Sequence, residues 1–380
     1  MENDIEIKKE EDSLKGQNMD VKIISSSKSG ESVTREEFEL FGGRIAGMNM
    51  MNESYEKMLD EERTKTQRRI KQTKSNGIHS VYAHNSITLY LDRVPKIILL
   101  ILKSLKQEVS EGVVYEDETS SKTKILYKKW VDIFKNKLTK VYKQENPNIT
   151  DIALTNIAKY YADYMTSIFA PVSMVYTTNY KAINYLISAF ECMISKANKS
   201  DFEEKVTPYI QDLVANLKGL PFYDEELASN RFAGGLNLFA DDKPTEEYFG
   251  DIYSTSYDAS MLELCESFDF KALDFSMRVK EGEYYIPEII ADSESFSELW
   301  ISDLKELEGT YPEATMITVH ETGTLSAFLT KIKYTRQMPK YLEIVNITED
   351  ILKKYEYALR MKIHPRAEEI ITYTKTEDNK

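Results

Sequence analysis

The side chains best suited to binding chemistry in this sequence are lysines and arginines that gather between positions 63 and 143. From Arg63 to Lys143 there are 18 Lys and Arg against 7 Asp and Glu, a local charge of +11 in a chain of net charge −14. Such groups bind phosphate oxygens without reading base sequence. We expect backbone contacts to RNA from the following residues: Arg63, Arg68, Arg69, Lys71, Lys124, Lys128, Lys129, Lys135 and Lys137. A solvated helix face, or a helix lying on an anionic membrane, would give the same pattern.

Groups that could carry catalysis or hold a metal are sparse. The chain has four histidines and two cysteines, and His79 and His84 are five residues apart, whereas ligands on one helix face need a spacing of three or four. GGRIAG lacks the Lys-Ser/Thr pair of a phosphate loop. The carboxylates between Glu263 and Glu298 cannot be told from a solvated acidic face. The sequence therefore predicts no catalytic residue, metal, cofactor or small-molecule substrate, and a protein that is not an enzyme.

A second region has the opposite charge. From Asp201 to Thr315 there are 8 Lys and Arg against 27 Asp and Glu, a local charge of −19. Segments of opposite charge on one chain favour head-to-tail association between copies. We expect a homo-oligomer, built as a shell or a filament.

The elements that must position these groups are mainly helical. Apolar residues at spacings of three and four predict helices from Val94 or Pro95, over Lys122–Lys143 with Trp130 in the core, and over 200–217 with Ser200 as N-cap. Thr150–Ala197 predicts a buried helix pair, interrupted at Pro171 and resuming near Thr177 or Thr178. No apolar stretch reaches the roughly 20 residues of a membrane span, so no membrane partner is expected.

The C-terminal part adds a small β component. Met261–Ser276 and Ser293–Leu307 predict acidic helices, with a strand or hairpin around Gly282 between them. Thr315–Glu321 and Leu325–Tyr334 predict a β-hairpin that turns at Gly323, and Thr348 is expected to cap a last helix. The fold class is accordingly mainly α with a small β component (α+β).

Four segments are expected in order along the chain. Residues 1–37 form a disordered acidic arm, 38–218 a helical core domain with a basic face, 219–260 an aromatic loop, and 261–380 an acidic α+β domain. Tyrosine and phenylalanine are common in subunit contacts. The loop residues expected to contact a neighbouring subunit are Phe222, Tyr223, Phe232, Phe239, Tyr248 and Phe249.

This layout, from Met1 to Lys380, resembles the coat proteins of small RNA viruses, particularly the helical-bodied partitivirus-like capsids. The resemblance implies a self-assembling coat protein that encloses an RNA genome, located in the virion or the host cytoplasm. An RNA-wrapping nucleoprotein of a negative-strand virus and a non-enzymatic cytosolic adaptor are the alternatives. The acidic arm departs from the basic arms common among coat proteins, which leaves genome contact to residues 63–143.

Overall fold

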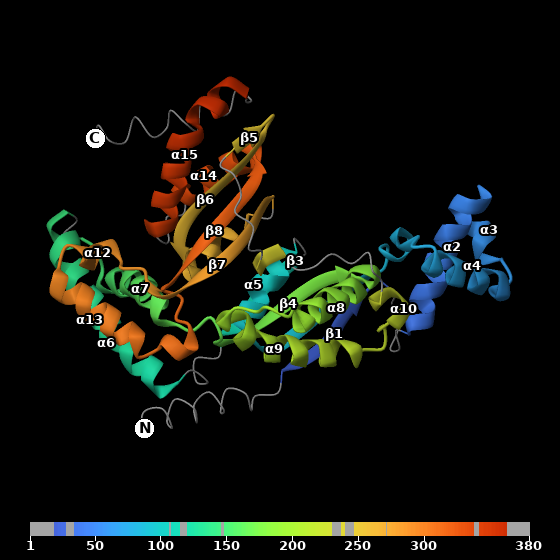
Figure 1. Ribbon diagram of the computed structural model, residues 1–380, viewed down its shortest axis with the longest axis horizontal. Helices are drawn as coiled ribbons and strands as arrows, with labels where there is room; N and C mark the ends of the chain where they lie inside the picture. Colours follow the sequence, from blue (N-terminus) through green and yellow to red (C-terminus); the bar gives the residue numbers. More distant parts are fainter. Residues whose placement is uncertain are drawn as a thin grey trace. The chain divides into compact units, whose positions relative to one another are not determined.

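A computed structural model of the chain describes residues 19–27, 34–105, 108–114, 120–145, 148–229, 237–239, 247–270, 272–337 and 342–362 (Figure 1). It is an α+β protein, as predicted. Its described residues form two compact units: unit 1 contains those within 120–170 and 237–362, and unit 2 contains those within 19–114 and 171–229. Each unit is assembled from separated stretches of chain, an arrangement that the linear division into four segments does not describe.

Unit 2 is built on a four-stranded antiparallel sheet of order β1-β2-β4-β3. Its strands are β1 Asp20–Ser26, β2 Ser86–Pro95, β3 Glu108–Val114 and β4 Pro171–Asn179. Helix α5 (Lys96–Ser104) follows β2 without a loop, α8 (Tyr180–Ser195) follows β4 in the same way, and α9 (Asp201–Lys218) comes next. The core forms because β2 alternates buried Ile87, Leu89 and Leu91 with half-exposed residues, as one covered sheet face requires.

A helical subdomain of unit 2 lies between β1 and β2. It contains α2 (Arg35–Met51), α3 (Tyr55–Leu59), α4 (Arg63–Ser75) and the 3₁₀ turn η1 (His79–Tyr82). The short helix α10 (Glu225–Ala228) follows α9. Thr34 and Glu37 form a capping box at the start of α2, which satisfies amide groups that the first helical turn leaves free.

Unit 1 contains a second four-stranded antiparallel sheet, of order β5-β6-β8-β7. Its strands are β5 Glu247–Phe249, β6 Ile252–Ser260, β7 Leu273–Tyr284 and β8 Thr315–Thr324. Helix α11 (Met261–Ser267) follows β6 directly, and α14 (Leu325–Gln337) and α15 (Leu342–Lys362) follow β8. The strand order and these connections repeat those of unit 2 element by element.

The remaining helices of unit 1 pack around two tryptophans. They are α6 (Ser121–Glu145), α7 (Asp151–Ala162), α12 (Glu288–Ala291) and α13 (Glu294–Lys305), together with the 3₁₀ turn η3 (Asp163–Met165). Two further 3₁₀ turns of unit 1 are η4 (Asn237–Phe239) and η5 (Glu308–Thr310). Trp130 of α6 and Trp300 of α13 are fully buried and meet edge to face, with ring centroids 4.7 Å apart. The prediction that Trp130 lies in the core is confirmed.

Several element predictions are wrong, and most of the errors concern strands. The expected helix pair is α7 and α8, but the interruption expected at Pro171 is the strand β4, and the second helix begins at Tyr180, after the predicted Thr177 or Thr178. The expected C-terminal hairpin is a single strand, β8, followed by helix α14, because Leu325, Phe328, Leu329 and Ile332 recur with helical period and are buried together.

Other boundaries also differ. Met261–Ser276 is helical only to Ser267 and then enters β7, and Thr348 lies inside α15 and does not cap it. The expected disordered arm, residues 1–37, lies largely outside the described residues, but its described part contains β1 and the start of α2. Within the described part of the chain, no helix combines the length and the apolar character needed to cross a bilayer.

Candidate functional site

Helix α4 has two faces of different character. Its inward face carries the buried residues Thr66, Arg69, Ile70, Thr73 and Lys74. Its outward face carries the exposed bases Lys65, Arg68 and Lys71 among amide and hydroxyl side chains. The three bases follow one another at intervals of three residues, which places them on one side of the helix. The sequence of α4, RTKTQRRIKQTKS, contains no Asp or Glu.

Two glycines of α2 let α4 approach closely. A Cβ atom added at Gly43 would lie 2.6 Å from the Ile70 side chain, and one at Gly47 would lie 2.6 Å from Nη1 of Arg69. Arg69 donates through Nη1 to the Gly43 carbonyl at 3.1 Å and forms an ion pair with Glu61, Nη2 to Oε1, at 2.6 Å. These contacts fix which side of α4 faces inward, and therefore which side carries its bases into solvent.

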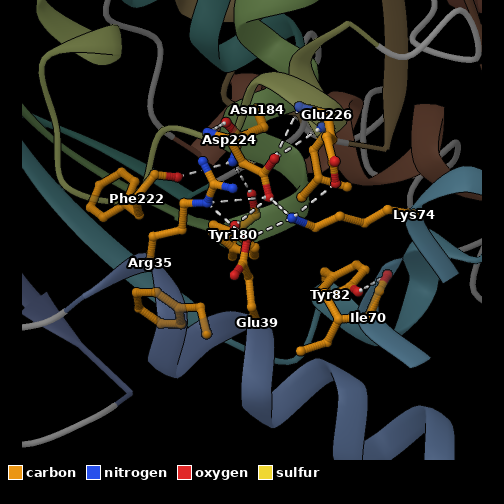
Figure 2. Close-up of polar contacts among 12 residues, drawn as sticks. Arg35, Glu39, Ile70, Lys74, Tyr82, Tyr180, Asn184, Phe222, Asp224 and Glu226 are labelled. Atoms are coloured by element: carbon orange, nitrogen blue, oxygen red, sulfur yellow. Dashed lines mark hydrogen bonds and ion pairs between the residues drawn. The ribbon is translucent and has the colours of Figure 1, made fainter. Parts of the chain in front are cut away.

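The end of α4 is anchored by a buried ion cluster, shown in Figure 2. The Lys74 ammonium lies 2.5 Å from Oδ2 of Asp224, 2.6 Å from Oε1 of Glu39 and 3.6 Å from Oε2 of Glu226. The side chain of Asp224 is fully buried, whereas that of Glu226 is 61% exposed. The cluster therefore holds α4 against α2 and α10, and its most deeply buried ion pair is that of Lys74 and Asp224.

Asp224 is held ionised although it is buried. Burial alone would raise the pKa of its carboxyl, but hydrogen bonds from Lys74 and from the Tyr180 hydroxyl, at 2.6 Å, bring the pKa below its usual value. Asp224 is also the N-cap of α10, because its Oδ1 accepts from the amides of Glu226 and Leu227. One carboxylate thus serves both a helix cap and an ion pair.

Neutral groups complete the anchor. Asn184 of α8 accepts from the Asp224 amide at 2.8 Å and donates to the Phe222 carbonyl at 3.2 Å. His79 lies with Nε2 2.8 Å from the Lys74 carbonyl and Nδ1 2.6 Å from the Tyr185 hydroxyl. A carbonyl oxygen can only accept, so Nε2 carries the proton and, in the neutral ring, Nδ1 accepts from Tyr185.

The bases of α4 that were predicted to contact RNA differ in their surroundings: some are paired within the protein and others are exposed. Arg63 is paired with Glu36, and Arg69 is buried against Glu61. Arg68 and Lys71 are exposed, and neither makes an ion pair with any residue that the structure describes. Lys65, which was not among the predicted residues, adds a third exposed base, close enough to Glu61 to help lower the pKa of that carboxyl after the larger effect of Arg69.

The predicted bases of α6 are largely engaged within unit 1. Lys129 forms an ion pair with the buried Asp303 at 2.6 Å, and Lys135 pairs with Asp151 at 2.7 Å. Lys137 lies over the Phe296 ring, 4.3 Å from its centroid. Lys124 and Lys128 lie on the exposed side of the helix. Because its lysines also hold α6 against neighbouring helices, the helix presents a smaller basic surface than its sequence suggests.

The aromatic residues expected at a subunit interface lie in different places. Phe222 is buried inside unit 2, 6.3 Å from the Phe38 ring, and so offers no surface to a partner. Tyr223 is half-buried beside Lys218, and Phe239 is half-buried in η4. Tyr248 and Phe249 belong to strand β5, and Phe232 lies outside the described residues.

The sequence did not reveal the role of Lys74 or Asp224. A signal was present for Asp224, which precedes Glu225 and Glu226 as an N-cap would, but its pairing with a lysine 150 positions away leaves no local trace. In the described part of the chain, His, Cys, Asp and Glu side chains form no group of three or more that could hold a metal ion.

Comparisons with known proteins give a likeness among solved structures and none among families or curated proteins. No protein-family model matches the chain, and no curated protein matches it. Among solved structures, the chain is similar to a UMP/dUMP methylase, PolB from Streptomyces cacaoi, bound with 5-Br dUMP. The likeness has 13% sequence identity and a TM-score of 0.34, and it covers 56% of this chain and 96% of that one.

This finding corrects two predictions. The sequence predicts a viral coat protein, with a nucleoprotein or a non-enzymatic adaptor as alternatives, and a protein that is not an enzyme. The structure that the chain resembles is an enzyme and not a capsid, so these predictions are wrong on this comparison and are not carried further. At this TM-score the likeness transfers no reaction, substrate or ligand to this chain.

Proposed function

We propose that the chain binds the phosphate backbone of a nucleic acid through the outward face of α4. The observation that supports this is the set of three exposed bases, Lys65, Arg68 and Lys71, on a helix without a single carboxylate. Arginine and lysine at such spacing contact successive phosphates, and neighbouring Gln67 and Gln72 can donate further hydrogen bonds. The ligand is recognised by charge and spacing, without base readout.

The anchor beneath α4 favours this function because it positions the helix before any ligand arrives. Gly43 and Gly47 set the distance from α2, and Lys74 fixes the last turn through Asp224. A rigid element loses less conformational freedom on binding than a flexible arm does. The three outward bases therefore remain on one surface, while the inward bases neutralise buried carboxylates.

The test measures binding of a fluorescent single-stranded oligoribonucleotide by anisotropy, with salt varied from about 50 to 200 mM. Lys65, Arg68 and Lys71 are changed together to Gln, a good helix former that α4 already contains. Single-stranded ligands give a salt slope of about −0.7 per neutralised phosphate, so removal of three contacts should flatten the slope of log K against log salt by about 2.

A matched variant removes three exposed lysines from α6, namely Lys128, Lys140 and Lys143, again by Gln. This α6 variant should bind the oligoribonucleotide with unchanged affinity and unchanged salt slope, because it loses the same number of positive charges but keeps the three bases of α4. An equal loss in the two variants, or no loss in the α4 variant with its unfolding transition intact, would refute the proposal.

A further inference from the structure

The repeated topology allows positions in the two sheets to be matched. In unit 2, Ile98 is the third residue of the helix that follows β2; in unit 1, Glu263 is the third residue of the helix that follows β6. Likewise Tyr176 and Glu321 lie four residues before the helices that follow β4 and β8. Strand pairing is offset by one residue here: Tyr176 pairs with Leu89, seven residues before α5, and Glu321 with Thr255, six residues before α11, because β2 has a register shift between Leu91 and Val94.

The matched positions differ sharply in chemistry. Leu186 is the seventh residue of α8, and its counterpart in α14 is Lys331. Unit 2 therefore fills these places with buried Ile98, Tyr176 and Leu186, whereas unit 1 places a glutamate, a glutamate and a lysine there, all fully or almost fully buried. The same sheet and helices form with either set, so the fold does not require the charged set. Burying such groups costs several kcal/mol per ion unless they are well paired.

One carboxylate of the charged set is well paired. Oε2 of Glu321 lies 2.9 Å from the Lys331 ammonium and accepts from the Tyr257 hydroxyl at 2.9 Å, and Tyr253 donates to its other oxygen. The ammonium and this carboxylate therefore balance each other. Lys331 lies farther from Glu263, at 3.7 Å from Oε1.

Two further carboxyl groups lack an equally close cation. Oε1 of Glu263 accepts from Ser267 at 2.7 Å, but its Oε2 has no hydrogen-bond partner among the described residues, although the side chain is fully buried. Glu343, in the first turn of α15, accepts from neutral donors: the Ser260 amide and hydroxyl, both at 2.7 Å, and the Tyr164 hydroxyl at 2.8 Å. Ser260 joins the two, because its hydroxyl also accepts from the Glu263 amide at 3.1 Å.

We propose that Glu263 and Glu343 form a proton-binding site in unit 1, and that the docking of α15 depends on the proton held there. With both groups ionised, the cluster would hold three buried carboxylates, those of Glu263, Glu321 and Glu343, against the ammonium of Lys331, which lies near the first two only. A proton on Glu343 gives its Oε2 a hydrogen to donate to Tyr164 or Ser260, whose hydroxyl groups can turn to accept it. Loss of the proton leaves a buried charge between α15 and α11 and weakens their contact.

The pKa values of both glutamates are shifted in the direction that the proposal requires. Burial raises the pKa of Glu343 to about 7, with hydrogen bonds from Ser260 opposing it and the charge of Glu263 adding to it. Burial also raises the pKa of Glu263, against the opposing effect of Lys331. Tyr164 from η3 and Tyr285 are titratable neighbours of Glu343, and Glu288 of α12 lies near the same two tyrosines. The folded state thus binds the proton more tightly than the unfolded state, so stability falls as pH rises from about 4.5 to about 7.

The experiment compares amide hydrogen exchange of α15 and α11 in the full chain at pH 6 and pH 8, corrected for the intrinsic pH dependence of exchange. The opening equilibrium of these helices should increase about tenfold between the two values. In Glu343→Gln, whose amide resembles the protonated acid, the increase should vanish. The matched control is Glu203→Gln, a buried glutamate of α9 paired with Lys196, which should keep the increase.

A second measurement does not depend on the variants. The infrared C=O band of a protonated, buried carboxyl group should be present in the unmutated protein at pH 6 and lose intensity towards pH 8. Absence of this band at pH 6, or a tenfold increase in exchange that persists in Glu343→Gln, would overturn the proposal. Both readouts are independent of nucleic-acid binding.

Discussion

Replacement of Lys74 by Met tests the anchor beneath α4 most directly. Methionine keeps the length and the apolar stem of the side chain, so the packing of the inward face should change little. What is lost is the ammonium between Asp224, Glu39 and Glu226. The effect therefore reports on charge and not on volume.

The magnitude follows from the burial of Asp224. Its side chain is fully buried, and without Lys74 its closest remaining side-chain donor is the Tyr180 hydroxyl. Removing one partner of a buried ion pair typically costs about 3–5 kcal/mol, because the other charge stays in the interior. We expect Lys74→Met to lower the free energy of unfolding of unit 2 by this amount.

The assay is urea unfolding of the full chain, in a double-mutant cycle with Asp224→Asn. Asparagine retains the N-cap of α10 while removing the charge, so the double variant should be more stable than the sum of the single losses predicts. The matched control is Lys57→Met, which breaks an exposed pair with Glu53 and should be nearly neutral. A loss below about 1 kcal/mol in Lys74→Met, or strict additivity in the cycle, would refute the reasoning.

Two packing predictions concern other contacts. Gly47→Ala should lower the free energy of unfolding, followed by thermal denaturation, by about 1–3 kcal/mol, because the new Cβ would lie 2.5 Å from the Met58 sulfur. Gly219→Ala, where the nearest atom would lie at 3.3 Å, should lower it less, and equal losses in the two variants would contradict this reasoning. Trp130→Phe removes the indole N–H that donates to Asp303 at 2.7 Å, and should cost about 1–3 kcal/mol in urea unfolding; an unchanged midpoint would show that the hydrogen bond is dispensable.

The sequence alone determined the helices whose signals are local. Helix α6 was predicted over Lys122–Lys143 and observed over Ser121–Glu145, and α9 has the predicted capping box of Ser200 and Glu203. The start of α5 after Pro95 and the core position of Trp130 were also predicted correctly. A helix closes its hydrogen bonds four residues away, so its apolar period and its caps can be read along the chain.

Tertiary structure decided the strands and the roles of the charged residues. Strand β4 was missed because its buried run is short and its partners, β2 and β3, lie far away in sequence. Of the bases predicted to face a nucleic acid, Arg69 and Lys129 proved to neutralise buried or half-buried carboxylates, while Arg68 and Lys71 remained in solvent. The role of a charged residue depends on which side chains the fold places next to it. A count of charges along the sequence contains no information about these spatial neighbours.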